Sequence, residues 1–275
     1  MIFKDKTVII TGASEGVGAA VAGLFADAGA NLMLVARGKK KLEKVADALR
    51  DRSRVEIFPM DVADQGACVD LFKKAQFEFG HVDILVNNAG YHARGPVEDV
   101  DADDLAKIID VNLRAPIVLG RIALPYLREA GEGAIINVGS LAGKVIYPGA
   151  ATYSASKAGL RLFSLALAEE LQGTNIKVGL VSPGPINTAF IMADIDGVSD
   201  ITFSQPMSTA LDVAQAVLDL CGNTVREEAM PKSSGVLTTI VGVMPWLGRM
   251  LRPALERKGR RQKDKLRSFG KSGQT

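Results

Sequence analysis

The sequence predicts a single doubly wound α/β domain, in which a mostly parallel sheet of about seven strands carries helices on both faces. Short apolar runs alternate with longer stretches of helical period from residue 7 to residue 222. The runs are apolar at nearly every position, as strands are when helices cover both faces of a parallel sheet. No linker divides them, so the repeated alternation indicates βαβ units in one sheet.

Four strand–helix pairs fill the first half of the chain. Each strand is a short run rich in β-branched residues. The strands are expected at residues 7–11, 31–36, 54–58 and 82–88. The helices after them repeat apolar residues every three or four positions. They are expected at residues 16–30, 39–51, 64–80 and 101–130.

Two further pairs follow in the second half. Their strands are expected at residues 133–140 and 176–182, and their helices at 150–172 and 209–222. Residues 186–208 have no clear period and contain Gly197 and Pro206, which predicts a long loop. Beyond residue 222 the pattern weakens. We therefore place the domain at residues 1–248 and a basic tail at 249–275.

Composition narrows the class of protein. With 275 residues, of which 47% are apolar and 23% charged, the chain can bury a sizeable core. Cys68 and Cys221 form no CxxC pair, and His81 and His92 lack metal-ligand spacing, so neither a disulfide framework nor a metal site is expected. The absence of a signal peptide and of an apolar run of about 20 residues predicts a cytoplasmic protein.

A glycine-rich turn follows the first strand directly and opens a helix. The segment TGASEGVG places Gly12, Gly16 and Gly18 where a tight turn lets backbone N–H groups approach a pyrophosphate at a helix N-terminus. Glycine trios also occur as plain turns, but the strand–turn–helix context favours a dinucleotide. This segment therefore predicts a Rossmann-fold nucleotide site.

The end of the second strand predicts which nucleotide binds. An NAD site usually carries an acidic side chain there for the ribose 2′-hydroxyl, whereas this chain has Ala36 followed by Arg37. A guanidinium can bind the 2′-phosphate of NADP(H), and no carboxylate at this position repels it. Lys40 and Lys41 are interpreted only as the solvated start of a helix. Glu15, beside the glycine turn, opposes an extra phosphate.

Six motifs occur in order along residues 5–222. They are TGASEGVG (11–18), NNAG (87–90), Asn112 in DVNL, Ser140 after IINVGS, YSASK (153–157) and SPGPINT (182–188). In this combination the chain resembles a short-chain dehydrogenase/reductase. The resemblance implies that these motifs and their neighbours hold a nicotinamide cofactor. The implied cofactor-binding residues are Gly12, Ser14, Gly16, Val17, Gly18, Arg37, Asp61, Val62, Asn88, Ala89, Gly90, Tyr153, Lys157, Pro183, Gly184, Ile186 and Thr188.

The resemblance also implies a catalytic set of Asn112, Ser140, Tyr153 and Lys157. Hydride transfer to a carbonyl leaves an alkoxide that needs a proton, and a tyrosine with a pKa of about 10 supplies it poorly unless a cation stabilises its phenolate. Lys157 lies one helical turn after Tyr153 on the same face. By the resemblance, Lys157 also binds the nicotinamide ribose, Ser140 polarises the carbonyl, and Asn112 anchors a water of a proton relay.

Three neighbouring side chains have no role in this set. Ser154 and Ser156 fall on other faces of the helix and are predicted to pack. Tyr147 is a candidate substrate contact because it lies close to the site in sequence.

These residues predict an NADP(H)-dependent oxidoreductase that interconverts a ketone and a secondary alcohol. In this family the segment at 186–208 covers the substrate pocket, and its apolar residues favour a lipophilic substrate, although they can equally pack on the body. These residues are Phe190, Ile191, Met192, Ile195, Val198, Ile201, Phe203 and Met207. A 3-oxoacyl-carrier-protein-type reductase is an alternative, disfavoured because the chain lacks a Gly-Gly pair near its end. A catalytically silent NADP-binding regulatory protein is the other alternative.

The resemblance further implies a homodimer or homotetramer, because family members pair through the helices expected here at 101–130 and 150–172. The second helix carries an apolar stripe that can face either a partner or the chain's own sheet. The stripe is formed by Leu160, Phe163, Leu167 and Leu171.

Charge is distributed unevenly. Residues 249–271 hold ten basic and two acidic residues, whereas the remainder holds 23 basic and 29 acidic residues. The segment WLGRML (246–251) puts apolar residues on one helix face, and Pro253 is expected to kink or end that helix. An amphipathic segment followed by basic residues favours a peripheral membrane contact, with a solvated tail or a partner-protein contact as the other interpretation. Nucleic acid is disfavoured because the body is acidic.

Overall fold

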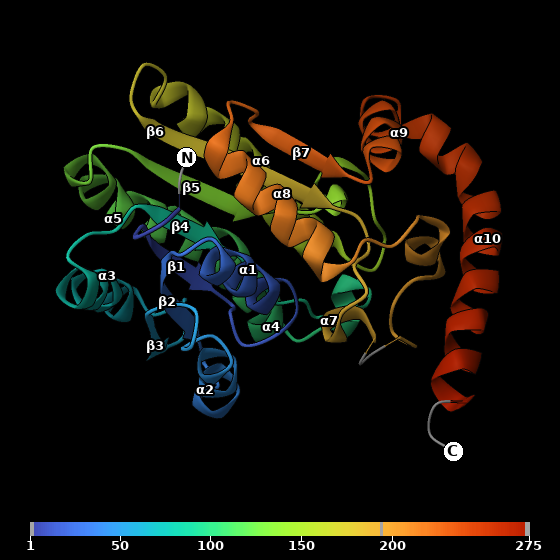
Figure 1. Cartoon of the computed structure of the whole chain (residues 1–275). Coiled ribbons are helices and arrows are strands. Elements are labelled where there is room, and N and C mark those ends of the chain that lie inside the picture. The colour runs from blue at the N-terminus through green and yellow to red at the C-terminus, as the bar shows by residue number, and fades with distance from the viewer. Residues whose placement is uncertain (1–2, 193–194, 273–275) are drawn as a thin grey trace.

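The computed structural model describes residues 3–192 and 195–272. Within them, seven strands form one sheet in the order β3–β2–β1–β4–β5–β6–β7 (Figure 1). All neighbouring pairs are parallel, so the predicted doubly wound fold is confirmed. The strands are β1 (Thr7–Thr11), β2 (Asn31–Ala36), β3 (Val55–Pro59), β4 (Ile84–Asn87), β5 (Gly133–Val138), β6 (Ile176–Pro183) and β7 (Glu227–Met230).

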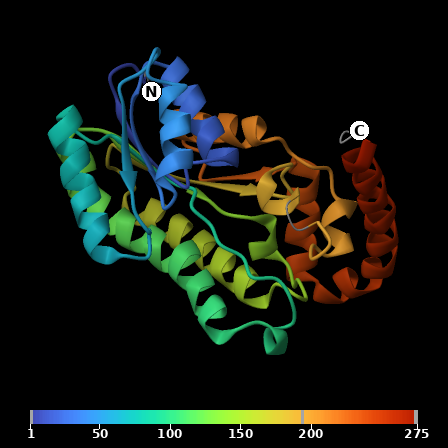
Figure 2. The ribbon, with the colours of Figure 1, turned by 90° about the horizontal axis from the view of Figure 1, so that it is seen from below.

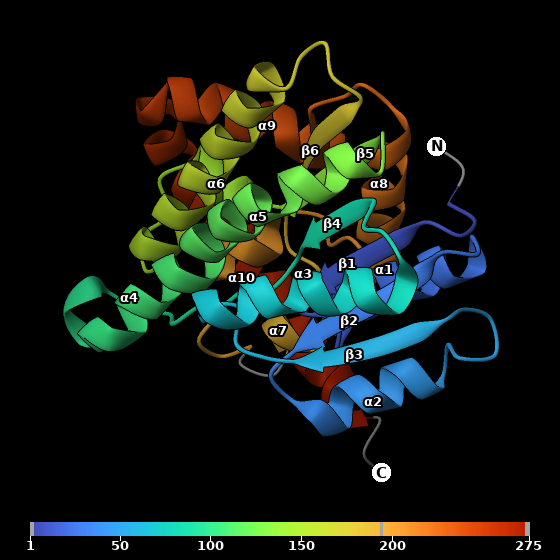
Figure 3. The same cartoon turned by 90° about the vertical axis from the view of Figure 1, so that its left-hand side faces the viewer.

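Helices cover both faces of the sheet (Figures 2 and 3). The α-helices are α1 (Gly16–Asp27), α2 (Lys39–Asp47), α3 (Gln65–Phe79), α4 (Ala102–Ile109), α5 (Ala115–Glu129), α6 (Ala151–Glu170), α7 (Ala189–Met192), α8 (Ala210–Gly222), α9 (Lys232–Val243) and α10 (Pro245–Ser272). Four shorter helical turns are η1 (Val97–Asp99), η2 (Asp110–Arg114), η3 (Leu141–Lys144) and η4 (Asp200–Ser204). Side chains of α1, α2 and α8 pack on one face, and those of α3, α5 and α6 pack on the other.

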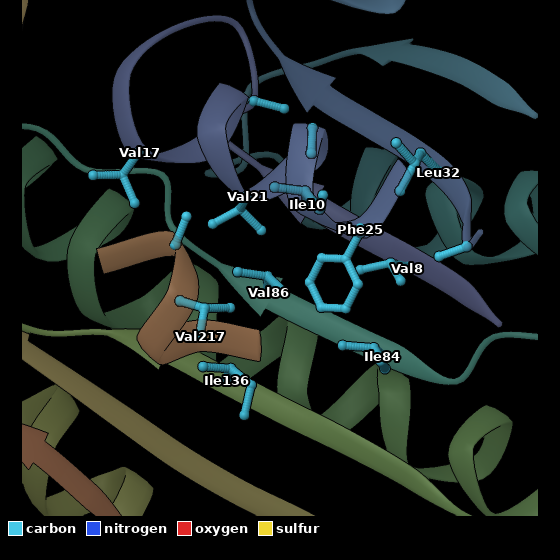
Figure 4. Packing of buried hydrophobic residues seen from close by; sticks show 14 of the residues in the cluster. Val8, Ile10, Val17, Val21, Phe25, Leu32, Ile84, Val86, Ile136 and Val217 are labelled. Carbon is cyan, nitrogen blue, oxygen red and sulfur yellow. The ribbon is translucent and has the colours of Figure 1, made fainter. Parts of the chain in front are cut away.

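Strand β1 shows why the strands are apolar at successive positions. Val8 and Ile10 belong to the core on one face and Ile9 to the core on the other, and all three are fully buried. On the first face they pack with Phe25 of α1 and Val217 of α8 (Figure 4). A strand with both faces covered has no solvent side, so strict alternation with polar residues is lost.

The strand order also determines where a crevice is expected at the edge of the sheet. β1 pairs with β2 on one side and β4 on the other, so the direction of winding reverses between β1 and β4. In open α/β sheets such a reversal leaves a crevice at the carboxyl ends of the strands. The glycine turn follows β1 and the NNAG motif completes β4, so both lie at this edge.

Two predicted elements differ in detail. The helix expected at 101–130 is divided by η2, a π-helical turn that contains Asn112. The loop expected at 186–208 contains α7 and η4, and residues 193–194 of it lie outside the described residues. These helices are four and five residues long, too short for a helical period to be visible in the sequence.

The largest difference is C-terminal. α10 continues past Pro253, so this proline does not end the helix, and a kink, the other predicted outcome, stays a prediction. A proline removes an interior hydrogen bond, and packing of α10 against η4 offsets that cost. The helix stands beyond the carboxyl ends of the strands (Figure 1). The predicted boundary at residue 248 falls inside it, and residues 249–272 are a docked helix rather than a solvated tail.

The surfaces predicted for association also differ. Leu160, Leu167 and Leu171 are buried in the chain's own core and Phe163 packs against it, so this stripe faces the sheet rather than a partner. Trp246 is exposed at the start of α10. None of the helices in the described part of the chain is long and apolar enough to span a bilayer. The peripheral membrane contact stays a prediction.

Candidate active site

A cavity of about 1430 Å³ opens at the carboxyl ends of the strands. It is lined by the glycine turn, by the ends of β2, β4, β5 and β6, and by α10. Of the cofactor-binding and catalytic residues predicted from the sequence, all except Gly18 and Asn112 line it. Those two residues lie behind the lining and support it.

The glycine turn is held by the Asn88 side chain of the NNAG motif. Asn88 Nδ2 donates to the carbonyl oxygens of Thr11 and Gly12, at 3.0 and 3.2 Å. A Cβ on Gly12 would lie 2.8 Å from that nitrogen, and a Cβ on Gly18 would overlap the Gly12 carbonyl. Gly12 and Gly16 also have φ values of 66° and 58°, which favour glycine. Side chains at these glycine positions would fill the turn. With glycine there, the turn forms an open cradle of backbone atoms.

This cradle fits a pyrophosphate. The N-cap residue of α1, Glu15, makes no side-chain cap hydrogen bond, so the first N–H groups of the helix are left to a ligand. The Glu15 carboxylate instead accepts a hydrogen bond from Lys41 Nζ at 2.8 Å. Lys41 lies on the cavity lining but remains well exposed in the first turn of α2, in agreement with its interpretation as the solvated start of a helix. The pairing offsets the charge by which Glu15 was expected to oppose an extra phosphate.

Tyr153 and Lys157 reach the cavity from α6, and Ser140 reaches it from the end of β5. Ser140 is the N-cap of η3, and its hydroxyl accepts from Ala142 N at 3.1 Å. Lys157 is only 5% exposed; its Nζ donates to Val138 O at 2.8 Å and lies 5.9 Å from the centre of the Tyr153 ring. Three of the four predicted catalytic side chains are therefore brought to one wall.

Burial shifts both members of the Tyr–Lys pair. Burial raises the pKa of Tyr153, while a hydrogen bond with Ser140 and the charge of Arg94 lower it. Burial lowers the pKa of Lys157 to about 8. The groups that act on the phenol here are thus Ser140 and Arg94, and the predicted lowering of its pKa by Lys157 stays a prediction.

Asn112 acts behind the cavity. Its Oδ1 accepts from Tyr91 N at 2.8 Å, and its Nδ2 donates to Tyr91 O at 2.9 Å and to Ser156 Oγ at 3.2 Å. Ser156 in turn donates to Tyr153 O at 2.7 Å. The amide therefore ties the loop after β4 to the helix that carries Tyr153. Ser156 was predicted only to pack, and it links Asn112 to that helix.

His92 was missed by the sequence analysis. Its ring stacks on that of Tyr153, with centroids 4.3 Å apart and planes at 17°. Burial lowers the pKa of His92 to about 4, so the imidazole is neutral at pH 7. Its Nδ1 atom is buried without a hydrogen-bond partner among the described residues. The only signal in the sequence is its position two residues after NNAG, at the carboxyl end of a central strand.

Cations also line the substrate side of the cavity. The segment 186–208 contributes none, but Arg94 reaches the cavity from the loop after β4, and Arg249 and Arg252 reach it from α10. Tyr147 lines the same region and hydrogen-bonds Thr202. A purely apolar pocket was the expectation, and it was incomplete because these cations come from two segments remote in sequence.

Helix α10 forms one wall of the cavity and is anchored by Lys263. This side chain is 5% exposed; its Nζ donates to the carbonyl oxygens of Val198 at 2.6 Å and Asp196 at 3.2 Å. Arg260 pairs with Asp200 of η4 at 3.1 Å. A Cβ on Gly259 would overlap the Asp200 carbonyl, so the helix approaches η4 at a point where only glycine fits.

Other reactive side chains take no part. Cys68 and Cys221 are buried and not joined in a disulfide, and burial raises the pKa of their thiols to about 11 and about 12. Neither is therefore a thiolate at neutral pH. In the part of the chain that the structure describes, no group of three His, Cys, Asp or Glu side chains could hold a metal ion.

The sequence model of the short chain dehydrogenase family matches residues 6–197. An uncharacterized oxidoreductase of Staphylococcus aureus (strain USA300) is 35% identical over 79% of this chain and 91% of its own length. Sulfoacetaldehyde reductase 2 of Chromohalobacter salexigens is 39% identical over 82% of this chain and 93% of its own length. A crystal structure from Sinorhizobium meliloti 1021, described as a short-chain alcohol dehydrogenase, superimposes with a TM-score of 0.76 at 31% identity, covering 83% of this chain and 96% of the other.

The family match spans the glycine turn, the NNAG motif and the Tyr–Lys pair, all of which line one cavity. The two relatives and the solved structure are consistent with this family match, because each is named as an oxidoreductase. Members of the family use a nicotinamide cofactor, either NAD or NADP, and act on alcohol or carbonyl groups. This chain belongs to the short-chain dehydrogenase/reductase family.

Proposed function

We propose that the protein is an NADP(H)-dependent reductase that interconverts a carbonyl compound and its alcohol. The observation that carries this proposal is one continuous cavity, lined at one end by the glycine turn and Arg37 and elsewhere by Ser140, Tyr153 and Lys157. A dinucleotide cradle and an acid–base pair thus share a single enclosure, as a hydride-transfer reaction requires.

In this proposal, three side chains of the protein polarise the carbonyl group and protonate its oxygen. Bound reduced nicotinamide supplies a hydride to the carbonyl carbon. Ser140 donates a hydrogen bond to the carbonyl oxygen and polarises it. Tyr153 donates its phenolic proton to that oxygen as negative charge develops, and the Lys157 ammonium stabilises the phenolate that remains. In the oxidative direction, the phenolate accepts the proton of the alcohol.

The choice of NADP(H) rests on the end of β2. Arg37 lines the cavity beside Ala36, where an NAD site usually has a carboxylate. A guanidinium binds a phosphate through paired charge-assisted hydrogen bonds. Asp61, Val62, Asn88, Ala89 and Gly90 are proposed to hold the adenosine half, and Pro183, Gly184, Ile186 and Thr188 the nicotinamide half.

Replacing Tyr153 with Phe tests the chemistry. The change removes the proton and little contact area, so turnover should fall on the order of 10²–10⁴-fold while NADPH binding, measured by fluorescence titration, is kept. Tyr126→Phe, a matched change on α5 outside the cavity, should keep activity. Turnover of the Tyr153 variant within a few-fold of wild type would exclude this residue as the acid. A wild-type protein that binds NADPH but reduces no carbonyl would indicate the silent regulatory alternative.

Replacing Arg37 with Asp tests the cofactor. The substitution puts a repelling carboxylate where the 2′-phosphate is expected, so the ratio of NADPH to NADH affinity should fall on the order of 10–100-fold. Lys40→Asp makes the same charge change three residues away, outside the cavity lining, and serves as the control. A wild-type preference for NADH would overturn this part of the proposal.

Two substrate classes are candidates. The apolar side chains that line the cavity, among them Ile146, Phe190 and Leu255, are compatible with the lipophilic ketone that the sequence predicts. The relative from Chromohalobacter salexigens is named for sulfoacetaldehyde, a small aldehyde that carries a sulfonate. The arginines on the cavity favour this second, anionic class. A panel of both classes, with a 3-oxoacyl thioester for the carrier-protein alternative, separates them by NADPH consumption.

A further inference from the structure

We propose that the substrate end of the cavity binds an anionic group of the substrate, a carboxylate or a sulfonate, through Arg94 and Arg252. The inference rests on the proposed carbonyl reduction, because it concerns the same cavity. It assigns a binding role to a loop and a helix that lie outside the motifs of the family.

Arg94 lies two residues beyond His92, whose ring stacks on Tyr153. Its guanidinium donates to Phe190 O at 2.8 Å and lies over the Phe190 ring at 5.4 Å from the centroid. These contacts hold the cation on the wall of the cavity, against α7. Its charge lowers the pKa of Tyr153 and of Tyr147, so a full positive charge lies within Coulombic reach of the reacting phenol.

The second cation comes from α10. Arg252 lines the cavity, and its Nε donates to Glu256 Oε1 at 2.6 Å, one helical turn further on. A guanidinium carries five N–H donors in a planar fork, so one edge can bind Glu256 while another faces a ligand. The charge of Arg252 also lowers the pKa of Tyr147. The Tyr147 phenol, hydrogen-bonded to Thr202, therefore lies within reach of both guanidinium groups and adds a polar side chain to the same region.

Cationic side chains outnumber acidic ones at this end of the cavity. Among the described residues that line it near Tyr147, η4 and α10, four are cationic and two are acidic, and Arg252 and Lys263 are themselves paired with Glu256 and Asp200. Both acids are engaged by α10, Asp200 by Arg260 and Lys263 and Asp196 by Arg267. The four cationic side chains are Arg94, Arg249, Arg252 and Lys263.

The phosphates of the cofactor do not account for these arginines. Arg37, which is inferred to bind the 2′-phosphate, follows β2, whereas Arg94 follows β4 on the other side of β1. The pyrophosphate cradle follows β1 itself. Carboxylates and sulfonates both present paired oxygens to a guanidinium, so the geometry admits either group.

The test compares carbonyl compounds that differ only in charge. Succinic semialdehyde and acetoacetate are each paired with their methyl esters, and kcat/KM with NADPH is measured for the full chain. Wild-type protein should prefer the acid of at least one pair. In Arg94→Gln and in Arg252→Gln, the acid-to-ester ratio should fall on the order of 10–100-fold, as expected for loss of a charge-assisted contact. The ratio is compared because removal of the Arg94 charge also affects Tyr153, and this should slow the reduction of the acid and of the ester alike.

Arg261→Gln is the matched control, since Arg261 is an exposed arginine of α10 outside the cavity lining. It should leave the ratio unchanged. Unfolding temperature and NADPH affinity are measured for every variant, so that a folding defect is recognised. An ester preferred by wild type in both pairs, or a ratio that survives both substitutions, would overturn the subsite.

A binding measurement separates this inference from the proposed reaction. In the presence of NADP⁺, isethionate, a sulfonate alcohol, should raise the unfolding temperature of wild type and of Arg261→Gln but not of Arg94→Gln. If no carbonyl compound is reduced but isethionate binds in this way, the proposed reaction fails and the anion subsite holds. If neutral carbonyls are reduced and isethionate produces no shift, the reaction holds and the subsite is wrong.

Discussion

Lys157 buries an ammonium group whose Nζ donates to the carbonyl oxygen of Val138. Its pKa is about 8 in the fold against 10.5 for the ordinary group, so at neutral pH both states are protonated and the folded state bears the cost of burying the charge. As pH rises from 8 to 10.5, the folded state loses its proton before the unfolded state does. Stability should therefore rise with pH across that window.

Replacing Lys157 with Met should stabilise the cofactor-free protein at pH 7.5 while abolishing turnover. A shift of this size corresponds to about 3 kcal/mol, from which the lost hydrogen bond subtracts about 1 kcal/mol. Urea unfolding at pH 7.5 and pH 10 measures it, and the advantage of the variant should shrink at the higher pH. Lys73→Met, at an exposed position of α3, serves as the control. A variant less stable than wild type at pH 7.5 would contradict this account.

His92 should remain neutral well below the pH at which an ordinary histidine titrates. Burial lowers its pKa to about 4, and the ring stacks on Tyr153. We expect the ¹H–¹⁵N signals of this imidazole to titrate with a midpoint below pH 5, well under the value of about 6.5 for an ordinary histidine. Because the unfolded chain binds that proton at higher pH than the fold does, this group should reduce stability as pH falls from 6.5 towards 4. A midpoint above 6 would show that the ring is not held as described.

The residues proposed to carry the chemistry differ in how far the sequence predicts them. Tyr153 and Lys157 are one helical turn apart, so their spacing brings them together, whereas Ser140, at the end of a recognisable strand, is added by the family resemblance. His92 and Arg94 lie in a loop, whose path depends on tertiary contacts rather than on a hydrophobic period. Their approach to Tyr153 depends on Asn112, whose amide fixes the start of that loop at Tyr91.

Among the elements, α10 is held to the substrate side of the cavity by a buried lysine. Replacing Lys263 with Met leaves two carbonyl groups, those of Asp196 and Val198, without their donor. Unpaired buried groups cost about 1–3 kcal/mol each. We therefore expect the KM of the carbonyl substrate to rise several-fold while the affinity for NADPH is unchanged. Steady-state kinetics and fluorescence titration measure the two quantities.

Lys258→Met is the control for this prediction, because Lys258 is exposed on the same helix. Gly259→Ala is a second way to disturb the docking, since a Cβ there meets the Asp200 carbonyl. It should reproduce the KM effect without touching a charge. Equal KM values in Lys263→Met and wild type would show that the helix does not shape the site.

Two elements, β7 and α10, are hard to recognise in the sequence because both are rich in charged residues. β7 consists of Glu227, Glu228, Ala229 and Met230, so it has no apolar run. It forms an edge of the sheet, and Glu227 is satisfied there by Lys144 and Arg161. α10 carries many charges and contains a proline, so its extent is hard to recognise in the sequence. Ion pairs with η4 help to hold it in place.

At the scale of the whole molecule, the association surface should lie on α5 and α6. These helices are side by side on one face (Figure 3). Although the predicted stripe is buried, Leu162 of α6 is 64% exposed, and Ile117 of α5 is exposed as well. We expect light scattering to give two or four times the 29.1 kDa chain mass.

Leu162→Glu should lower that mass, because a charge in the centre of an apolar contact is costly. Phe77→Glu removes a still more exposed apolar side chain from α3 and is expected to change nothing. A wild-type mass of a single chain would rule out this assembly in solution.

The position of α10 in the chain has an evolutionary consequence. The glycine turn, the NNAG motif and the Tyr–Lys pair are complete by residue 157, whereas the wall formed by α10 begins only at residue 245. This helical wall, one of the segments proposed to contact the substrate, is therefore a contiguous stretch that follows every motif proposed to bind the cofactor. A duplicated gene could acquire a new substrate by altering that stretch alone, with the redox machinery untouched. A protein engineer could follow the same route by exchanging residues 232–272 between two such reductases.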